Sequence, residues 1–260
     1  MTSPPHDTPT VPDYVVGHGL LDGLGVVVTA AAGSGIGSAT ARRCLEEGAR
    51  VVVSDRHERR LAEVADELGV VGIPCDVTDD TSVRSLMAGA AEVLGGIDVL
   101  VNNAGLGGTA EVHEMTDDQW QSVLGVTLTG TFQCTRAVLG HMYGRGSGVI
   151  VNNASVLGWR AQRGQAHYAA AKAGVMALTR CTAVEAAPHG VRVNAVAPSL
   201  AMHANLAKVT SDELLDELTA AEAFGRAAEP WEIANVIVFL ASPYSSYLTG
   251  EVISASSQHP

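Results

Sequence analysis

The hydrophobic pattern of this 260-residue chain alternates between short β-branched runs and longer segments with helical spacing. Six of the seven short runs are nearly continuous in apolar or β-branched residues, which is typical of strands covered by helices on both faces of a sheet. The predicted strands are residues 26–28, 50–54, 70–75, 97–102, 148–153, 191–196 and 251–256. A sheet buried on both faces is expected to be parallel.

The segments between these strands carry apolar residues every three or four positions. Three of them, SATARRCLEEG, HERRLAEVADELG and TSVRSLMAGAAEVLGG, end at glycine, a common helix stop. Strands that alternate with helices predict an α/β fold: a single Rossmann-type domain in three layers, with a doubly wound parallel sheet of seven strands. In such a fold the ligand binds beyond the carboxyl ends of the strands.

The boundaries of the domain follow from composition. Residues 1–13 are expected to form a flexible tail, and residues 14–260 the domain. The longest connection between strands, residues 201–233, is mostly amphipathic helix. At the ligand end of the sheet this predicts a substrate lid around residues 200–228, although an ordinary pair of surface helices fits the same pattern.

Charge narrows the range of partners. The chain has 28 acidic residues against 16 basic ones, a formal net charge of -12, which repels nucleic acid and anionic membrane surfaces. The first residues contain neither the basic nor the apolar stretch of a secretory signal, and no run is apolar enough to span a membrane. We therefore expect a cytoplasmic protein that acts on a small molecule.

The cysteines are scattered at Cys44, Cys75, Cys134 and Cys181, with no C-x-x-C pair and no histidine at the spacing of a metal ligand. This pattern predicts buried, reduced thiols. It argues against both a disulfide framework and a metal site.

A glycine-rich turn, TAAAGSGIG at residues 29–37, directly follows the first strand. Its glycines match neither the G-x-G-x-x-G of dinucleotide sites nor the G-x-x-x-x-G-K-[ST] of nucleoside triphosphate loops. By itself the stretch fits a turn without a ligand as well as it fits a phosphate site.

A carboxylate, Asp55, follows the second strand about 20 residues after this turn. A carboxylate there can accept hydrogen bonds from an adenosine ribose and repel a 2′-phosphate, and a helix cap is the alternative role. The neighbouring Arg56 favours NADP instead. Together the two residues predict NAD, with NADP as the weaker alternative.

Tyr168 and Lys172, in HYAAAKAG, lie on one face of a predicted helix. A nearby ammonium favours the ionised phenol, whose pKa must fall by about 3 units for it to act as a base at neutral pH. Ser155 lies thirteen residues before the tyrosine at the end of a strand, where its hydroxyl can hold a substrate oxygen.

From about residue 20 to residue 253 the sequence resembles the short-chain dehydrogenase/reductase family. The resemblance rests on the glycine-rich turn, Asp55, Asp76-Val77, Asn102 to Gly105, Ser155, and Tyr168 with Lys172. It implies a nicotinamide cofactor and a homo-oligomer, usually a tetramer or a dimer. It also implies that Tyr168 moves the hydroxyl proton, that Ser155 orients the oxygen, and that Lys172 lowers the tyrosine pKa and binds the nicotinamide ribose. No metal is required.

The resemblance also assigns a set of cofactor contacts along the carboxyl edge of the sheet. These are Ser34, Gly35, Ile36, Gly37, Asp55, Arg56, Asp76, Val77, Asn103, Ala104, Gly105, Tyr168, Lys172, Pro198, Ala201 and His203. The family loop reads T-G-x-x-x-G-x-G, which places Ala31 at the first glycine and makes the loop here one residue longer, with Gly33 or Ser34 absorbing the insertion.

The sequence departs from the family in three places. Thr127 replaces an asparagine in WQSVLGVTLTGTF, and we include it among the catalytic candidates with a shorter relay to the lysine or none. The usual P-G-x-x-x-T reads PSLAMH at residues 198–203, and a common D-G-G near the end is replaced by SASSQHP. These departures leave open a dinucleotide-binding regulator without catalysis.

The expected substrate pocket lies around the loop that follows Ser155. Its candidate residues are Trp159, Arg160, Gln162 and His167. Arg160 or Arg163 can meet an anionic group, while solvated or structural roles are the alternatives for these residues and for His167.

The expected function is hydride transfer between a secondary alcohol or ketone and a nicotinamide. GWRAQ, MALTRC, EAFGRAAEPWE and TGEVIS resemble bacterial steroid-catabolism dehydrogenases that act on hydroxylated indane coenzyme A thioesters. The rival within the enzyme class is a 3-oxoacyl thioester reductase that uses NADPH.

Overall fold

A computed structural model of the protein describes residues 10–202 and 212–257. Seven parallel strands form one sheet in the order β3-β2-β1-β4-β5-β6-β7. The strands are β1 Gly25–Thr29, β2 Arg50–Asp55, β3 Val71–Pro74, β4 Val99–Asn102, β5 Gly148–Asn153, β6 Val191–Pro198 and β7 Val252–Ala255. The prediction of a doubly wound parallel sheet of seven strands is confirmed, and the predicted ends shift by two residues at most.

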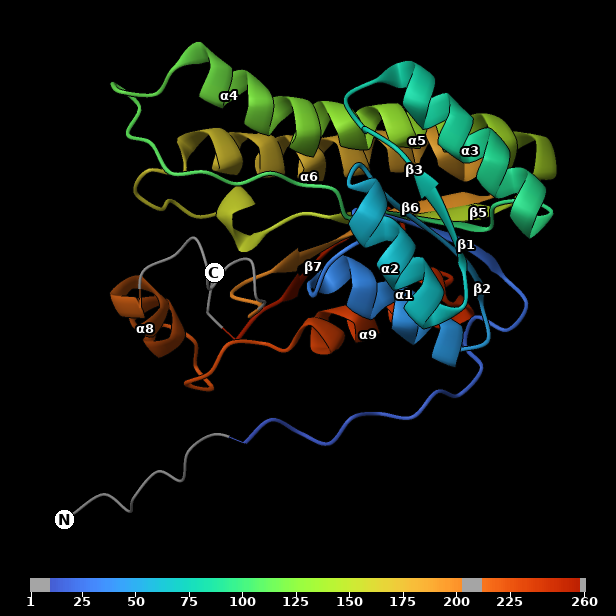
Figure 1. Ribbon diagram of the computed structural model, residues 1–260, viewed down its shortest axis with the longest axis horizontal. Helices are drawn as coiled ribbons and strands as arrows, with labels where there is room; N and C mark the ends of the chain where they lie inside the picture. Colours follow the sequence, from blue (N-terminus) through green and yellow to red (C-terminus); the bar gives the residue numbers. More distant parts are fainter. Residues whose placement is uncertain (1–9, 203–211, 258–260) are drawn as a thin grey trace.

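Helices cover both faces of the sheet (Figure 1). On one face lie α1 Ile36–Glu46, α2 Glu58–Leu68 and α9 Pro230–Ala241. On the other lie α3 Asp80–Leu94, α5 Gly130–Arg145 and α6 Ala166–Ala186. A shorter helix, α4 Asp117–Leu124, continues through a π-helical turn at Gly125–Thr129 into α5, and α8 is Asp212–Ala220.

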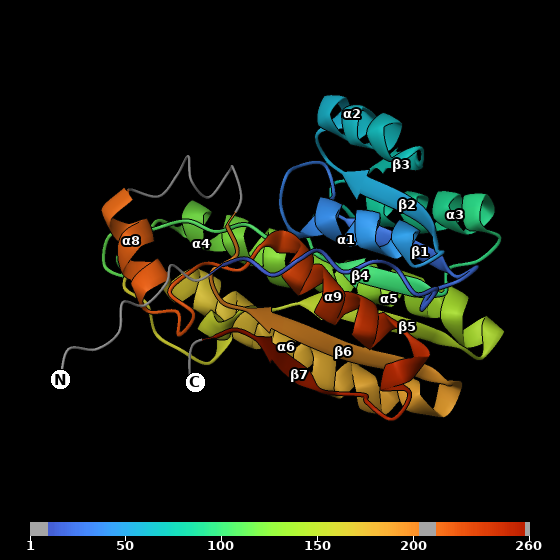
Figure 2. The same ribbon diagram turned by 90° about the horizontal axis from the view of Figure 1, so that it is seen from below.

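The central strand β1 shows why its residues are all apolar. Val26 and Val28 pack into the core shared with α1 and α9, whereas Val27 packs into the core shared with α3 and α5. Successive side chains of a strand point to opposite faces, so a strand covered on both sides needs a continuous apolar run. The strands run toward the end of the molecule where α8 lies (Figure 2).

Two of the predicted glycine stops are helix caps of the left-handed type. Gly69 after α2 and Gly95 after α3 both have φ of 67°. Cys44, Cys75 and Cys134 are buried free thiols as predicted, but Cys181 is exposed on α6, so that part of the prediction is wrong. Cys181 lies on the side of α6 that faces away from the core, so its thiol is not buried.

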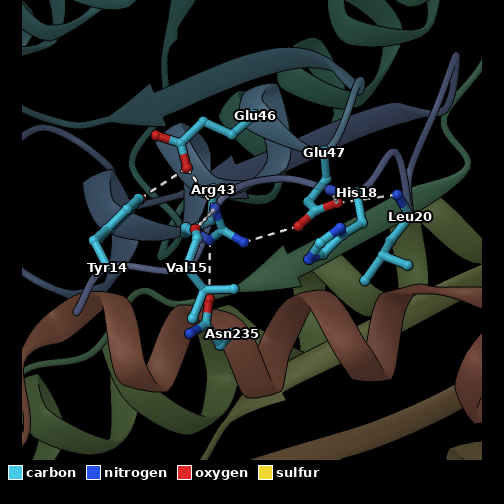
Figure 3. Close-up of polar contacts among 8 residues, drawn as sticks. All are labelled: Tyr14, Val15, His18, Leu20, Arg43, Glu46, Glu47 and Asn235. Carbon is cyan, nitrogen blue, oxygen red and sulfur yellow. Dashed lines mark hydrogen bonds and ion pairs between the residues drawn. The ribbon is translucent and has the colours of Figure 1, made fainter. Parts of the chain in front are cut away.

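A strap of chain before the first strand, residues 14–20, is held against α1 by a buried ion pair (Figure 3). Arg43 and Glu47 lie one helical turn apart, with 2.8 Å between Nη2 and Oε1, and their side chains are only 3% and 1% exposed. Glu47 Oε2 also accepts hydrogen bonds from the backbone N–H of His18 at 2.8 Å and of Leu20 at 3.0 Å.

The same arginine extends the contact to α9 (Figure 3). Arg43 Nε donates to Asn235 Oδ1 at 2.9 Å, and Nη1 donates to the carbonyl of Val15 at 3.0 Å. Tyr14 places its ring edge against Trp231 of α9, with 5.1 Å between ring centres. We call this group of contacts the Arg43 clamp. Its residues are Tyr14, Val15, His18, Leu20, Arg43, Glu46, Glu47, Trp231 and Asn235.

Residues 10–13 of the predicted tail are exposed and have no regular structure, and residues 1–9 lie outside the described residues. Within the described residues, no helix combines the length and the apolar character that crossing a membrane requires.

Candidate active site

Three strands end side by side at the carboxyl edge of the sheet, and asparagine side chains join them. Asn103, just after β4, donates through Nδ2 to the carbonyls of Thr29 at 3.1 Å and Ala30 at 3.0 Å. Its Oδ1 accepts a hydrogen bond of 2.9 Å from Asn153 Nδ2 at the end of β5. Asn103 therefore fixes the ends of β1, β4 and β5 relative to one another, and its contact with a cofactor stays a prediction.

A second asparagine pair lies one residue deeper. Asn102 and Asn152 are paired in register, and Asn102 Nδ2 donates to Asn152 Oδ1 at 2.9 Å. Each side chain also bonds a threonine of a covering helix, Thr135 of α5 at 3.0 Å and Thr179 of α6 at 2.9 Å. The sequence analysis did not assign Asn152 and Asn153 a role. The repeated Asn-Asn doublet at the ends of two predicted strands is a signal that could have indicated one.

Ser155 and Tyr168 meet at this edge. Ser155 begins a short 3-10 turn after β5, and its Oγ accepts a hydrogen bond of 3.2 Å from the Leu157 N–H. The hydroxyl is also hydrogen-bonded to Tyr168, which lies in the first turn of α6. The structure thus brings together the two side chains that the sequence analysis placed at one site.

Lys172 follows one turn later on the same face of α6. Its Nζ lies 5.5 Å from the centre of the Tyr168 ring and donates a hydrogen bond of 2.5 Å to the carbonyl of Asn153. The side chain is only 3% exposed. Asn153 bonds Asn103 through its side chain and Lys172 through its carbonyl, so the asparagine pair also helps to position Lys172 relative to the Tyr168 ring.

Burial controls the ionisation of both groups. It raises the pKa of Tyr168 to about 12, against the lowering effect of the Ser155 hydrogen bond. It lowers the pKa of Lys172 to about 8. Burial disfavours the charged form of each group. The lowering of the phenol pKa that the sequence analysis expects from Lys172 stays a prediction for the protein with its cofactor.

Thr127 lies in the π-helical turn and is buried. Its Oγ1 accepts a hydrogen bond of 3.0 Å from the Leu106 N–H and lies 3.3 Å from the Leu106 carbonyl, to which it donates. Its own carbonyl accepts a bond of 2.8 Å from Thr131. A Cβ built on Gly105 would lie 3.9 Å from Thr127 Oγ1 and 3.5 Å from Lys172 Nζ. Thr127 thus holds the loop that faces the lysine instead of touching the lysine itself.

A cavity of about 280 Å³ opens beside this loop. Its wall contains six of the residues that the sequence analysis assigned to the cofactor. The lining residues are Ala30, Ser54, Asp55, Arg56, His57, Cys75, Asp76, Val77, Ala104, Gly105, Leu106 and Val126.

Asp55 occupies the wall at the end of β2. Its Oδ2 accepts a hydrogen bond of 3.2 Å from the Ala32 N–H in the glycine-rich turn, and its Oδ1 accepts one of 3.0 Å from the His57 N–H. The carboxylate therefore links the turn to the strand and still faces the cavity. Arg56 lies next to it in the same wall.

Asp76 and Val77 form the wall after β3. Hydrogen bonds from the Thr78 backbone and hydroxyl hold the pKa of Asp76 below its usual range, and the charge of Arg56 adds to this effect. Val77 is buried against α5, where a Cβ on Gly130 would fall 2.7 Å from Val77 Cγ2. The wall is thus polar on one side and apolar on the other, which suits a flat base attached to a sugar.

The glycine-rich turn is compact at its two ends. Ala30 has φ of 51°, a left-handed conformation that normally favours glycine. Gly37 allows no side chain, since a Cβ there would fall 2.4 Å from the Ala30 carbonyl oxygen and 2.5 Å from Asn103 Nδ2. Helix α1 begins at Ile36 with Gly35 as its N-cap, and the first amides of a helix are free to bind a phosphate.

The sequence analysis places Ala31 at the first glycine of the family loop, and this alignment stays a prediction. In the structure Ala30, directly after Thr29, takes the left-handed conformation. Gly33 and Ser34, the two residues predicted to absorb the insertion, are exposed between the turn and α1. Residues 34–37 do not belong to the cavity wall, which reaches the turn only at Ala30.

Pro198 ends β6, the strand beside β5 in the sheet. The Ala154 N–H donates to the carbonyl of Val196 at 2.8 Å, so the residues after Val196 run alongside Ser155. Ala201, farther along, is buried and bridges Ala228. His203 lies outside the described residues, as does part of the predicted lid at 200–228, and both stay predictions.

Two loops form one rim of the site. The Ala110 N–H donates to the carbonyl of Gly164 at 3.0 Å, which joins the loop after β4 to the loop after β5. Between the same two loops, Arg163 Nε donates a hydrogen bond of 2.6 Å to Glu111 Oε1. Arg163 is therefore engaged in a surface ion pair in this structure.

The predicted pocket residues separate by burial. Trp159 is 47% exposed, and Arg160 and Gln162 are partly buried in the same loop. His167 is only 1% exposed, and its Nε2 would lie 3.2 Å from a Cβ on Gly108. His167 thus packs beneath the rim and does not reach an open pocket here.

Comparison with known proteins gives the family. A family profile described as Enoyl-(Acyl carrier protein) reductase matches residues 30–257. The chain belongs to the short-chain dehydrogenase/reductase family.

One relative, the (5R,7aS)-5-hydroxy-7a-methyl-1-oxo-2,3,5,6,7,7a-hexahydro-1H-indene-carboxyl-CoA reductase of Mycobacterium tuberculosis, is 64% identical over 258 residues, covering 96% of this chain and 98% of the relative. A 3-oxoacyl-(acyl-carrier-protein) reductase of Vibrio cholerae is 37% identical over 235 residues, covering 90% and 96%. The crystal structure of a short chain dehydrogenase from Mycobacterium smegmatis is 56% identical and covers 98% of this chain and 100% of its own, with a TM-score of 0.87.

As a member of this family the chain is an oxidoreductase that binds a nicotinamide dinucleotide. The structure fits that group: the cavity wall carries a carboxylate at Asp55, and Gly105 adds no side chain to the same wall. Among the residues that the structure describes, no group of three His, Cys, Asp or Glu side chains is arranged to hold a metal ion.

Proposed function

We propose that this chain is a reductase of a bicyclic carboxyl-CoA thioester that carries ring oxygens, the class of compound in the name of the M. tuberculosis relative. The identity of 64% over nearly the whole of both chains carries this proposal. The meeting of Ser155, Tyr168 and Lys172 at one edge of the sheet supports it.

In the proposed reaction the hydroxyl of Ser155 holds the ketone oxygen, and Tyr168 donates its proton to that oxygen. A bound reduced nicotinamide supplies the hydride. The hydrogen bond between the Tyr168 and Ser155 side chains places the proton donor next to the group that would hold the ketone oxygen. Lys172, fixed by the Asn153 carbonyl, places its positive charge near the phenolate that remains. The alcohol product leaves with one proton from the protein and one hydride.

We propose NADH rather than NADPH as the hydride donor. The carboxylate of Asp55 lies in the cavity wall and would repel a 2′-phosphate. Arg56 in the same wall is the group that would favour the phosphate. We give Asp55 more weight than Arg56 in the choice of cofactor, because two backbone N–H groups hold the Asp55 carboxylate in place.

We also propose that the protein works as a homo-oligomer, a dimer or a tetramer, in the cytoplasm. Exposed aromatic side chains support the oligomer: Phe239 on α9, and Tyr244 and Tyr247 just after it, are 39%, 76% and 100% exposed. Aromatic residues are enriched at protein interfaces. The free cysteines suit a reducing compartment such as the cytoplasm.

A second candidate is a 3-oxoacyl thioester reductase that uses NADPH. The 37% identity to the V. cholerae reductase and the presence of Arg56 in the wall favour it. A regulator that binds the dinucleotide without catalysis is disfavoured, because the relatives are named as reductases and dehydrogenases.

An assay with two cofactors and two substrates separates these functions. The purified protein is given NADH or NADPH with either an oxo-indane-carboxyl-CoA thioester or acetoacetyl-CoA, and oxidation of the nicotinamide is followed by absorbance. We expect turnover of the indane thioester with NADH to exceed every other combination. Preference for acetoacetyl-CoA with NADPH would support the second candidate. Turnover by Tyr168→Phe equal to that of the unchanged protein would contradict the catalytic mechanism.

A further inference from the structure

A buried carboxylate, Glu222, joins two segments that are far apart in the sequence. Its side chain is only 4% exposed. Oε1 accepts a hydrogen bond of 3.2 Å from the Leu200 N–H, just after β6, and Oε2 accepts one of 2.7 Å from Ser257 Oγ, just after β7. One side chain thus bonds to the chain beyond each of the last two strands.

Backbone hydrogen bonds bring the same segments together. The Ser199 N–H donates to the Ala255 carbonyl at 3.4 Å, and the Ala223 N–H donates to the Ser257 carbonyl at 3.3 Å. The Ala228 N–H donates to the Leu200 carbonyl at 2.8 Å. We call residues 199–202, 222–228 and 255–257 the C-terminal junction, with Glu222 at its centre.

The junction borders the catalytic serine. β5 and β6 pair in parallel register up to Asn153 and Val196, and the Ala154 N–H bonds the Val196 carbonyl at 2.8 Å. Ser155 is the next residue on one strand, and Pro198 ends the other. The start of the junction therefore lies at the same edge of the sheet as Ser155 and Tyr168.

Both segments that Glu222 joins are places where this chain departs from the family pattern. Residues 198–203 read PSLAMH, and the end of the chain reads SASSQHP from Ser254. Glu222 bonds one residue of each, Leu200 and Ser257. The carboxylate therefore supplies a fixed contact in a region whose usual sequence is absent.

Burying a carboxylate costs more free energy than burying an apolar side chain. Removing an ionised group from water costs several kcal/mol unless hydrogen bonds replace the lost solvation, and an apolar side chain of similar volume is often at least as stabilising. Glu222 has such hydrogen bonds to Leu200 and Ser257, so its buried side chain links two particular segments instead of only filling space.

We propose that Glu222 is a positioning residue that holds residues 199–201 in place for the nicotinamide. This inference rests on the proposed function, since it requires a bound nicotinamide dinucleotide. It concerns no atom that Glu222 itself transfers: the carboxylate acts through the Leu200 backbone. Loss of the contact is expected to weaken cofactor binding and to change kcat less.

The test measures NADH binding directly, by nucleotide fluorescence, in the full-length protein. Glu222→Gln keeps the size of the side chain but replaces one acceptor with a donor and removes the charge. We expect the Kd for NADH to rise about tenfold, the equivalent of one charge-assisted hydrogen bond. Ser257→Ala removes a single donor and is expected to raise the Kd about threefold. This milder variant decides the matter if Glu222→Gln does not fold.

Glu47→Gln is the matched control. Glu47 is another buried carboxylate that accepts two backbone N–H bonds, but it lies in the Arg43 clamp beside the strap. A loss of stability alone would weaken both variants in thermal unfolding and leave the Kd for NADH unchanged in both. That outcome, or equal binding by Glu222→Gln and the unchanged protein, overturns the positioning role. If the unchanged protein binds neither NADH nor NADPH, the proposed function fails first and the positioning role fails with it.

Discussion

Two buried cations in this protein have opposite surroundings. Arg43 lies between carboxylates, 2.8 Å from Glu47, and every nitrogen of its guanidinium has a hydrogen-bond partner. Lys172 forms no ion pair within the described part of the chain and donates to a single carbonyl, that of Asn153. Both side chains are only 3% exposed.

The difference separates a structural site from a chemical one. In the Arg43 clamp the charges are matched, and the pKa of Glu47 stays below its usual range despite burial, because backbone N–H groups and Arg43 stabilise the charged form. At the candidate active site burial is compensated only in part, by the Ser155 hydrogen bond to Tyr168, so the pKa of Lys172 falls to about 8 and that of Tyr168 rises to about 12. Strongly shifted groups in a cleft are characteristic of functional sites.

Removal of the phenol hydroxyl should have the largest effect. Tyr168→Phe takes away the proton donor and the partner of Ser155 while it leaves the ring in place. We expect kcat/KM to fall about 10³–10⁴-fold in the reductase assay, with little change in the thermal midpoint. A fall of less than tenfold would mean that another group donates the proton.

The next largest effect should come from the clamp and should be on stability alone. Arg43→Met leaves Glu47 buried without its cation, which we expect to cost about 3–5 kcal/mol of unfolding free energy in urea. The kcat of the folded fraction should stay the same, because the clamp lies beside α9 and the strap. The double variant Arg43→Met/Glu47→Leu is the control and should recover most of the loss. If the single variant lowers kcat while it remains fully folded, the clamp is not purely structural.

Lys172→Met should change stability and activity in opposite directions. The buried ammonium is costly, so we expect the variant to gain about 1–3 kcal/mol of unfolding free energy while it loses most of its kcat/KM. The folded pKa of about 8 lies below the ordinary 10.5, so the unfolded chain holds more protons between these values. Stability should therefore rise with pH across this window in the unchanged protein, and this slope should be absent in the variant. Urea unfolding at pH 7.5 and pH 10 measures both.

The fold was accessible from the sequence because each step depended on a local pattern. The continuous run at Val26–Val28 predicts a strand buried on both faces, and glycine predicts the ends of α2 and α3. Ser155 and Tyr168 were found because a strand end and a helix start bring fixed positions to one edge of the sheet.

Long-range contacts were not accessible in the same way. Nothing local at Arg43 indicates that, besides Glu46 and Glu47, it also bonds residues of α9 and of the strap before β1. The deep burial of His167 depends on the loop that passes over it, which the helix pattern does not show. The direction of the pKa shift at Tyr168 likewise depends on how completely the fold excludes water, and no spacing argument supplies that.

The smallest effect should be at Thr127, where the hydroxyl both accepts from and donates to Leu106. Thr127→Val keeps the shape but removes the hydroxyl from two partly buried backbone groups of Leu106, and we expect a loss of about 1 kcal/mol of unfolding free energy. Because Gly105 lies between Thr127 and Lys172, the same change should raise the KM for the nicotinamide about threefold, with little effect on kcat. Thr127→Ser retains the hydroxyl and should restore the KM. If Thr127→Val lowers kcat as strongly as Lys172→Met does, the threonine acts in the proton relay itself, and the division between structural and chemical groups must then include the π-helical turn.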